Sequence, residues 1–209
     1  MDATNLLIAE DSDIEHVVYN LCKRYQLPEQ FKVKNKGSVS TVLKELTIEL
    51  KSPTLKRLGV VIDADADLPQ RWQSVVDRLQ KFGYRHVPVI PEISGTIIVE
   101  LGRPKLGIWL MPNNQLAGMV EHFAAFLIPQ GDSLWPMAQR VVLEIPDDSR
   151  RFNHPIKAQV HTWLAWQEDP GRPIGTAITN RYLDANAPHA QQFVNWLKRL
   201  FELEATPSP

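Results

Sequence analysis

Short apolar runs alternate with amphipathic helical patterns along the first half of the chain. Apolar residues that recur every three or four positions indicate helices, and continuous apolar runs indicate strands buried on both faces. Alternation of the two is typical of βα units that build a mostly parallel sheet, so we predict an α/β fold with helices flanking the sheet. The expected strands are residues 5–9, 31–36, 58–63, 97–101 and 106–111, and the expected helices are residues 12–25, 38–50 and 69–82.

The second half of the chain has a mainly helical pattern. We expect a helix over residues 115–127, a short helix or turn at 132–136, a loop at 147–153 and a hairpin turn at 102–105. Two further helices are expected, one from Pro155 to about 169 and one over 187–203. The sequence therefore predicts an α/β core over residues 1–127 and a helical extension over 128–209 that packs on it as part of one compact unit.

Acidic side chains follow two of the predicted strands. The first cluster is Glu10, Asp11 and Asp13, and the second is Asp63, Asp65 and Asp67. Ligands of open parallel sheets bind outside the carboxyl ends of the strands, so we expect the two clusters to meet there. Side chains of an extended chain alternate in direction, so we expect the aspartates of the second cluster to project to one side, with Ala64 and Ala66 on the other.

Several carboxylates in one crevice raise one another's pKa values unless a cation compensates their charge. The donors are oxygens, with His16 as the nearby imidazole, so Mg²⁺ or Mn²⁺ is favoured over zinc. Such ions commonly serve phosphoryl chemistry. The alternative interpretation is that these acids are solvated loop ends and helix caps, with Asp11 or Ser12 at the first helix and Asp67 before the third. The alternation of Asp with Ala after a buried strand favours the metal site.

Two segments resemble the motifs of the TOPRIM domain, which occurs in topoisomerases, primases, recombination mediators and overcoming-lysogenization-defect nucleases. They are Ala9-Glu10, with an acid three residues later, and the run from Val60 to Asp65. Residues 6–18, 107–114, 118, 121–123, 154–158 and 161–165 are similar to an uncharacterised bacterial family of TOPRIM-like proteins. This resemblance covers most of the chain and implies a TOPRIM-like fold.

The resemblance implies that Glu10 acts as general acid or base and that Asp63 and Asp65 bind Mg²⁺, with Asp13 and Asp67 contributing through water. The chain departs from the family pattern at Asp11, Ile14 and Asn113. We expect metal-dependent phosphodiester chemistry on nucleic acid, most simply that of a nuclease. The alternative is a non-catalytic module that binds a metal, a nucleotide or another protein.

Further polar residues are weaker candidates for substrate contacts. His154, Lys157 and His161 share one face of a predicted helix and are expected near a phosphate or metal, or in a structural role. Arg151 precedes that helix and can clamp an anion, although loop arginines are usually solvated. Three lysines alternate along residues 32–36, where they either contact phosphates or protect an edge strand from pairing.

Composition limits the classes of partner. The chain has 209 residues, 44% of them hydrophobic, which is enough for a sizeable core. Its 23 basic and 24 acidic residues give a net charge of -1, so any nucleic-acid site must be local. We expect no membrane span and no signal peptide. The single cysteine, Cys22, excludes an internal disulfide, and we expect a cytoplasmic protein.

Overall fold

The computed structural model describes residues 4–203. The fold is built on a five-stranded sheet with the strand order β2-β1-β3-β5-β4. The strands are β1 (Asn5–Ala9), β2 (Lys32–Asn35), β3 (Arg57–Asp63), β4 (Thr96–Ile98) and β5 (Lys105–Met111). Neighbouring strands are parallel except for β4, which pairs antiparallel with β5. The predicted α/β class, with a mostly parallel sheet flanked by helices, is confirmed.

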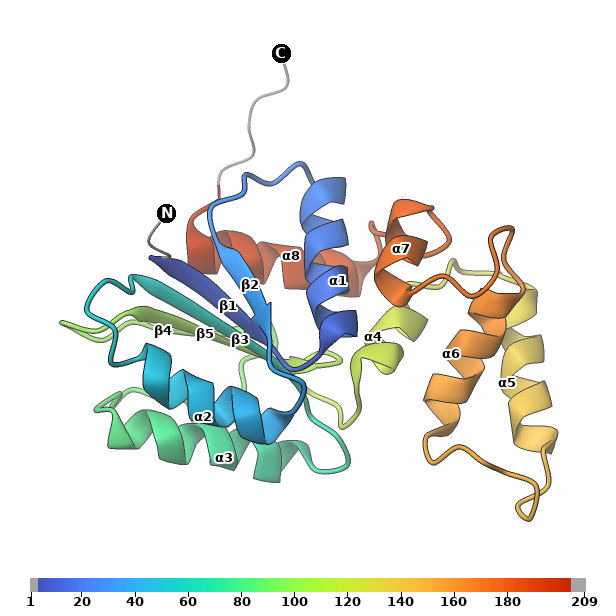
Figure 1. Cartoon of the computed structure of the whole chain (residues 1–209), viewed down its shortest axis with the longest axis horizontal. Helices are drawn as coiled ribbons and strands as arrows, with labels where there is room; N and C mark the ends of the chain where they lie inside the picture. The colour runs from blue at the N-terminus through green and yellow to red at the C-terminus, as the bar shows by residue number, and fades with distance from the viewer. Residues whose placement is uncertain (1–3, 204–209) are drawn as a thin grey trace.

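Eight helices are described, and they cover both faces of the sheet (Figure 1). They are α1 (Ser12–Arg24), α2 (Val39–Glu49), α3 (Leu68–Lys81), α4 (Val120–Phe126), α5 (Leu134–Glu144), α6 (Pro155–Ala165), α7 (Ile174–Thr179) and α8 (Pro188–Phe201). Helices α2 and α3 pack on one face, while α1, α7 and α8 lie on the other. The α5–α6 hairpin stands at one end of the molecule, and none of the helices in residues 4–203 is long and apolar enough to cross a membrane.

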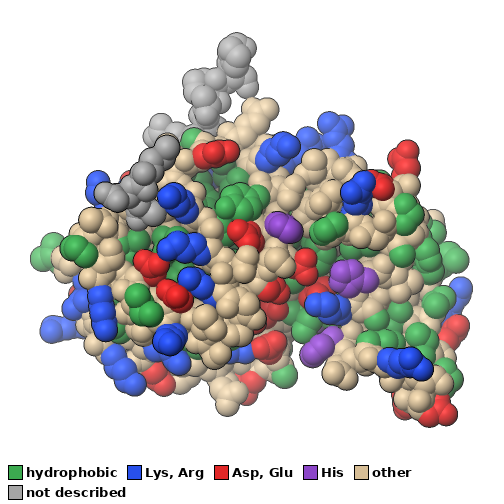
Figure 2. Space-filling view, in the orientation of Figure 1, with side chains coloured by type: hydrophobic (Ala, Val, Ile, Leu, Met, Phe, Trp, Pro, Cys, Tyr) green, Lys and Arg blue, Asp and Glu red, His purple; other side chains and the backbone are tan. Residues whose placement is uncertain are grey.

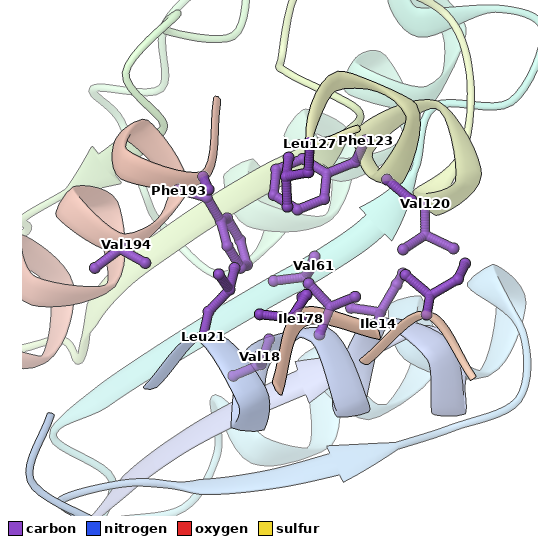
Figure 3. Close-up of a cluster of buried hydrophobic side chains, with 14 of the residues drawn as sticks. Ile14, Val18, Leu21, Val61, Val120, Phe123, Leu127, Ile178, Phe193 and Val194 are labelled. Carbon is purple, nitrogen blue, oxygen red and sulfur yellow. The ribbon is translucent and has the colours of Figure 1, made fainter. Parts of the chain in front are cut away.

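The larger of the two apolar clusters joins the two halves of the chain (Figure 3). Ile14 and Val18 of α1 meet Val61 of β3, Phe123 of α4 and Phe193 of α8 there. Each of these side chains is fully buried. Residues on both sides of position 128 therefore share one core, and the division of the chain at that position stays a prediction.

Two glycines let α8 approach the centre of the sheet closely. Gly59 of β3 and Gly107 of β5 are partners in the sheet register, and both face Leu200. A Cβ atom at Gly107 would lie 2.5 Å from Leu200 Cδ2, and one at Gly59 would lie 3.0 Å from the same atom. Leu200 is fully buried, so it fills the hollow that the missing side chains leave.

The helices of the second half differ from the sequence prediction. Helix α4 begins at Val120 rather than at residue 115, because the side-chain oxygen of Asn113 accepts hydrogen bonds from the backbone N–H groups of residues 115 and 116 and holds a turn there. The predicted short helix or turn at 132–136 is the start of the longer, 11-residue helix α5, whose first turn accommodates Pro136. Helix α7 was not expected, while the loop at 147–153 is confirmed.

Strand β2 lies at an edge of the sheet. Lys34 Nζ is 3.1 Å from Glu49 Oε1, and Lys36 Nζ is 3.1 Å from Glu45 Oε1. Both glutamates belong to α2. These lysines therefore tie the edge strand to its neighbouring helix, and charged residues at an edge oppose pairing with another sheet.

Candidate functional site

Glu10 and Asp63 meet at the carboxyl ends of two neighbouring strands. Glu10 directly follows β1, and Asp63 is the last residue of β3, which pairs with β1. The backbone N–H of Glu10 donates to Val61 O at 3.0 Å, and the backbone N–H of Asp63 donates to Glu10 Oε2 at 2.9 Å. The expectation that these two strand ends lie side by side is confirmed.

The Asp63 carboxyl is almost completely enclosed, with 8% of the residue exposed. Its Oδ1 atom accepts a 3.0 Å hydrogen bond from the backbone N–H of Val120, the first residue of α4. Burial is the largest cause that raises the pKa of Asp63 to about 9, and the charges of Glu10, Asp11, Glu121 and Asp65 raise it further. In the absence of a cation, this carboxyl therefore holds a proton at neutral pH.

Glu10 lies in a similar but more open environment. Burial raises its pKa, and the neighbouring charges of Asp65 and Asp11 act in the same direction. The hydrogen bond from the Asp63 N–H and the charge of Arg71 oppose that shift. The charge of Glu10 raises the pKa of Asp63, whereas Asp63 acts on Glu10 through the hydrogen bond from its backbone N–H, which lowers the pKa of Glu10.

The other two aspartates of the second cluster have local partners. At Asp65 the backbone turns into the left-handed region, with φ +54°, and its N–H donates to Gly118 O at 2.8 Å. Its exposed carboxylate forms an ion pair with Arg71. Asp67 Oδ1 accepts from Gln70 N at 2.8 Å and caps α3. The predicted alternation is wrong beyond Asp63, because the strand ends there and the chain leaves the extended conformation.

A buried glutamate that the prediction omitted completes the acidic cluster. Glu121, on the first turn of α4, has 1% of its surface exposed, and its charge contributes to the raised pKa of Asp63. Lys157 Nζ of α6 lies 3.0 Å from Glu121 Oε1. The hydrogen bond to Glu121 is the largest cause that raises the pKa of Lys157, and the charges of Asp13 and Asp11 add to it. The signal in the sequence was an acid inside the apolar run 119–128.

The remaining candidates lie at different depths. His154 directly precedes α6. Burial is the largest cause that lowers the pKa of His122, and the nearby charge of His154 lowers it further. Arg151 and His161 are exposed, and within residues 4–203 no hydrogen bond or ion pair joins them to the carboxylates. Figure 2 shows acidic and histidine side chains side by side between the sheet and the α5–α6 hairpin. Of the four weaker candidates, Lys157 and His154 are therefore the ones beside the acidic cluster or its neighbours.

Comparison with known families assigns the chain to one of them. The family described as "Protein of unknown function (DUF3226)" matches residues 4–202. The chain belongs to DUF3226. No curated protein and no solved structure matches it. The match includes every strand and helix described above, so the DUF3226 unit contains the α5–α6 hairpin and α8 as well as the sheet.

The donor set of this DUF3226 chain fits a hard cation by its chemistry. The charges of Glu10 and Glu121 each raise the pKa of Asp63, and this excess of negative charge around Asp63 is the kind that Mg²⁺ relieves. In residues 4–203 no group of three histidine, cysteine or acidic side chains is arranged to hold a metal ion. Asp65 is turned toward Arg71, so a metal site with Asp65 as a ligand requires that this ion pair open.

Proposed function

We propose that this chain catalyses metal-dependent phosphodiester chemistry on nucleic acid, most simply as a TOPRIM-type nuclease. The observation that carries the proposal is the hydrogen-bonded pair of Glu10 and Asp63 at neighbouring strand ends. An acid that follows the first strand and an acid at the end of the adjacent strand match the arrangement that a TOPRIM-like fold requires. The raised pKa values of both groups support a role in chemistry, because perturbed acids cluster at functional sites.

Each side chain has a proposed role. Glu10 moves the proton as general acid or base, and its raised pKa brings it closer to the pH at which proton transfer is efficient. Asp63 and Asp65 would hold Mg²⁺ or Mn²⁺, while Asp13 and Asp67 would act through water. When bound, the ion supplies polarisation of a phosphate oxygen and activation of water.

The nucleic acid would be bound by basic groups close to the site, because the chain as a whole has a net charge of -1 and does not attract a polyanion. Lys157 and His154 border the acidic cluster from α6 and are proposed to contact phosphates there. Arg151 and His161 are proposed to contact phosphates farther along the nucleic-acid strand. A cytoplasmic location, where nucleic acid is present and the Cys22 thiol stays reduced, fits this function.

A nuclease assay with matched variants tests the proposal. The purified protein is incubated with single- and double-stranded DNA and RNA in Mg²⁺, Mn²⁺ or chelator, alongside Glu10→Gln and Glu29→Gln. Both variants lose one negative charge, but Glu29 lies in an exposed loop near the amino end of β2. We expect cleavage that requires metal, survives Glu29→Gln and falls about a thousandfold in Glu10→Gln. Cleavage that survives Glu10→Gln would contradict the assigned role.

A non-catalytic binding module is the second candidate, and the local partners of Asp65 and Asp67 favour it. Because the Asp65 carboxylate pairs with Arg71 and the Asp67 carboxylate caps α3, Glu10 and Asp63 remain as two proposed site acids that form no ion pair within residues 4–203. Calorimetric titration with Mg²⁺ and with nucleotides separates the candidates. Binding without turnover supports the module, and no metal binding at millimolar concentration counts against both functions.

A further inference from the structure

A recess of about 630 Å³ opens beside Glu10, on the face of the sheet that α2 and α3 cover. It is bounded by the start of α2, the turn that follows β3 and the first turns of α3. Small-molecule sites commonly measure about 300–1,000 Å³, so the recess has room for more than a single ion. Because it reaches Glu10 and Asp65, a ligand bound there is adjacent to the acidic pair.

Two arginines and several hydroxyl groups line this recess. Arg71, Ser74 and Arg78 are three and four residues apart, so they lie on one face of α3. Ser38 and Ser40 contribute hydroxyl groups from the start of α2. Guanidinium and hydroxyl groups are the side chains that most often bind phosphate oxygens.

The hydrogen-bonding capacity of the two guanidinium groups is only partly used. One terminal nitrogen of Arg71 binds Asp65, but its Nε atom is buried and has no hydrogen-bond partner within residues 4–203. Arg78 Nη1 donates to the backbone oxygen of Ser74 at 2.7 Å. Across that same described range, no carboxylate forms an ion pair with Arg78, although Glu10, Asp65 and Asp67 line the same recess.

The start of α2 adds partial positive charge to the same recess. Ser38 caps this 11-residue helix by accepting from Thr41 N at 3.3 Å. The first turn of α2 contains no acidic residue, whereas the first turn of α1 contains Asp13 and Glu15. The positive end of the α2 dipole therefore faces the recess without a protein carboxylate of its own first turn to neutralise it.

We propose that this recess binds a phosphate group of the substrate and holds it beside Glu10. The inference rests on the proposed function, because it assigns the substrate phosphate a place next to the proposed general acid or base. The ligand class is a nucleotide or a nucleic-acid end that carries a phosphomonoester. Arg78 binds the phosphate oxygens, and Arg71 donates hydrogen bonds from the N–H groups that do not bind Asp65. Ser40 lies at the α2 end of the same recess.

Binding of small phosphates tests this proposal without turnover. Isothermal titration in Mg²⁺ compares inorganic phosphate, adenosine 5′-monophosphate and adenosine, none of which contains a phosphodiester bond. Arg78→Gln is measured beside Arg140→Gln, which removes one positive charge from the exposed surface of α5. We expect adenosine 5′-monophosphate to bind more tightly than inorganic phosphate, and adenosine not to bind. Arg78→Gln should lower the affinity for both phosphate-containing ligands about tenfold or more, whereas Arg140→Gln should leave it unchanged.

A second variant keeps the test decisive if Arg78→Gln unfolds. Ser40→Glu places a negative charge in the first turn of α2, where it favours the helix and repels an anion. We expect a melting temperature no lower than that of the wild type, together with loss of phosphate binding. Equal binding by the wild type and both variants, equal affinity for adenosine and its monophosphate, or no binding of either phosphate overturns the inference.

The inference and the proposed function can fail separately. If Glu10→Gln abolishes cleavage while Arg78→Gln leaves phosphate affinity unchanged, the nuclease function stands and the recess is not its phosphate site. If no nucleic acid is cleaved but phosphate binding requires Arg78, the recess is a binding site and the nuclease function fails.

Discussion

Asp63 and Asp65 are two residues apart and have opposite environments. Asp63 ends a buried strand, has 8% of its surface exposed, and lies among other acids. Asp65 itself adopts the left-handed conformation, is exposed, and is paired with Arg71. Identical side chains in one short motif therefore have different chemistry, because the position of the strand end decides which carboxylate is buried with its neighbours.

The largest expected effect is on stability, from Asp63→Asn in the metal-free protein. Asparagine keeps an oxygen for the Val120 N–H and replaces a carboxyl that must hold a proton at pH 7 in order to stay buried beside Glu10, which costs free energy because the unfolded chain releases that proton. At pH 7 we expect the free energy of unfolding to rise by up to about 4 kcal/mol, since one pKa unit corresponds to about 1.4 kcal/mol. Urea denaturation in chelator measures the change.

The same variant predicts a pH dependence with a definite sign. The pKa of Asp63 is raised from 3.8 to about 9 in the folded protein, so the folded state holds a proton that the unfolded chain releases. The stability from this group is fully present below about pH 4 and is lost as pH rises toward 9. The gap between the wild type and Asp63→Asn should therefore be small at pH 4 and grow up to pH 9. A gap that is the same at every pH would show that Asp63 is not buried among like charges.

Divalent metal should give the next largest effect. A ligand that binds the folded state adds about 2.7 kcal/mol at one hundred times its Kd, which for a chain of this length raises Tm by roughly 5–10 °C. We expect this rise for the wild type in Mg²⁺ or Mn²⁺ and its loss in Asp63→Asn. Thermal melts with metal and with chelator measure it. A wild-type Tm that does not respond to millimolar metal would contradict the metal site.

A smaller effect on the free energy of unfolding is expected from substitutions of Asp67 at the start of α3. Its side chain caps α3, and removal of such a cap costs about 1 kcal/mol. Asp67→Ala should therefore lower the free energy of unfolding by that amount, and Asp67→Ser should restore most of it. If Asp67→Ser abolishes the response to Mg²⁺ while preserving stability, Asp67 belongs to the metal site as well as to the cap.

The smallest effect is expected at Asp65. Ion pairs at the protein surface contribute about 0–1 kcal/mol, and salt screens them. Asp65→Asn should therefore change the free energy of unfolding by less than about 1 kcal/mol, and 1 M salt should remove the difference. A loss comparable in size to the gain from Asp63→Asn would mean that the two aspartates are not energetically distinct.

Most of the sheet was predictable because its strands are continuous apolar runs between clear helix signals. The second half was harder for identifiable reasons. Pro136 suggests a break, yet it lies in the first turn of α5, where a missing N–H costs nothing. Gly175 weakens the helical pattern of α7, yet a Cβ atom there would lie 2.6 Å from His16 Cβ, so close packing on α1 explains the glycine.

The candidate site was predictable as far as strand order places it. Glu10 and Asp63 follow from the rule that carboxyl ends of neighbouring parallel strands meet. The left-handed turn at Asp65 and the burial of Glu121 depend on the loop before α4 and on Lys157 of α6. Those contacts join residues far apart in the chain, so the acid inside the apolar run 119–128 is visible in the sequence but its partners are not.

The hollow formed by Gly59 and Gly107 has a consequence for the order in which the protein is made. Its occupant, Leu200, lies 93 positions after Gly107 in the chain. Synthesis from the amino terminus therefore produces the central strands before the helix that covers them. Until α8 is made, the apolar face of the sheet on which it packs stays exposed to water. Contacts of such long range form slowly, so nascent chains should be most vulnerable to aggregation just before α8 emerges.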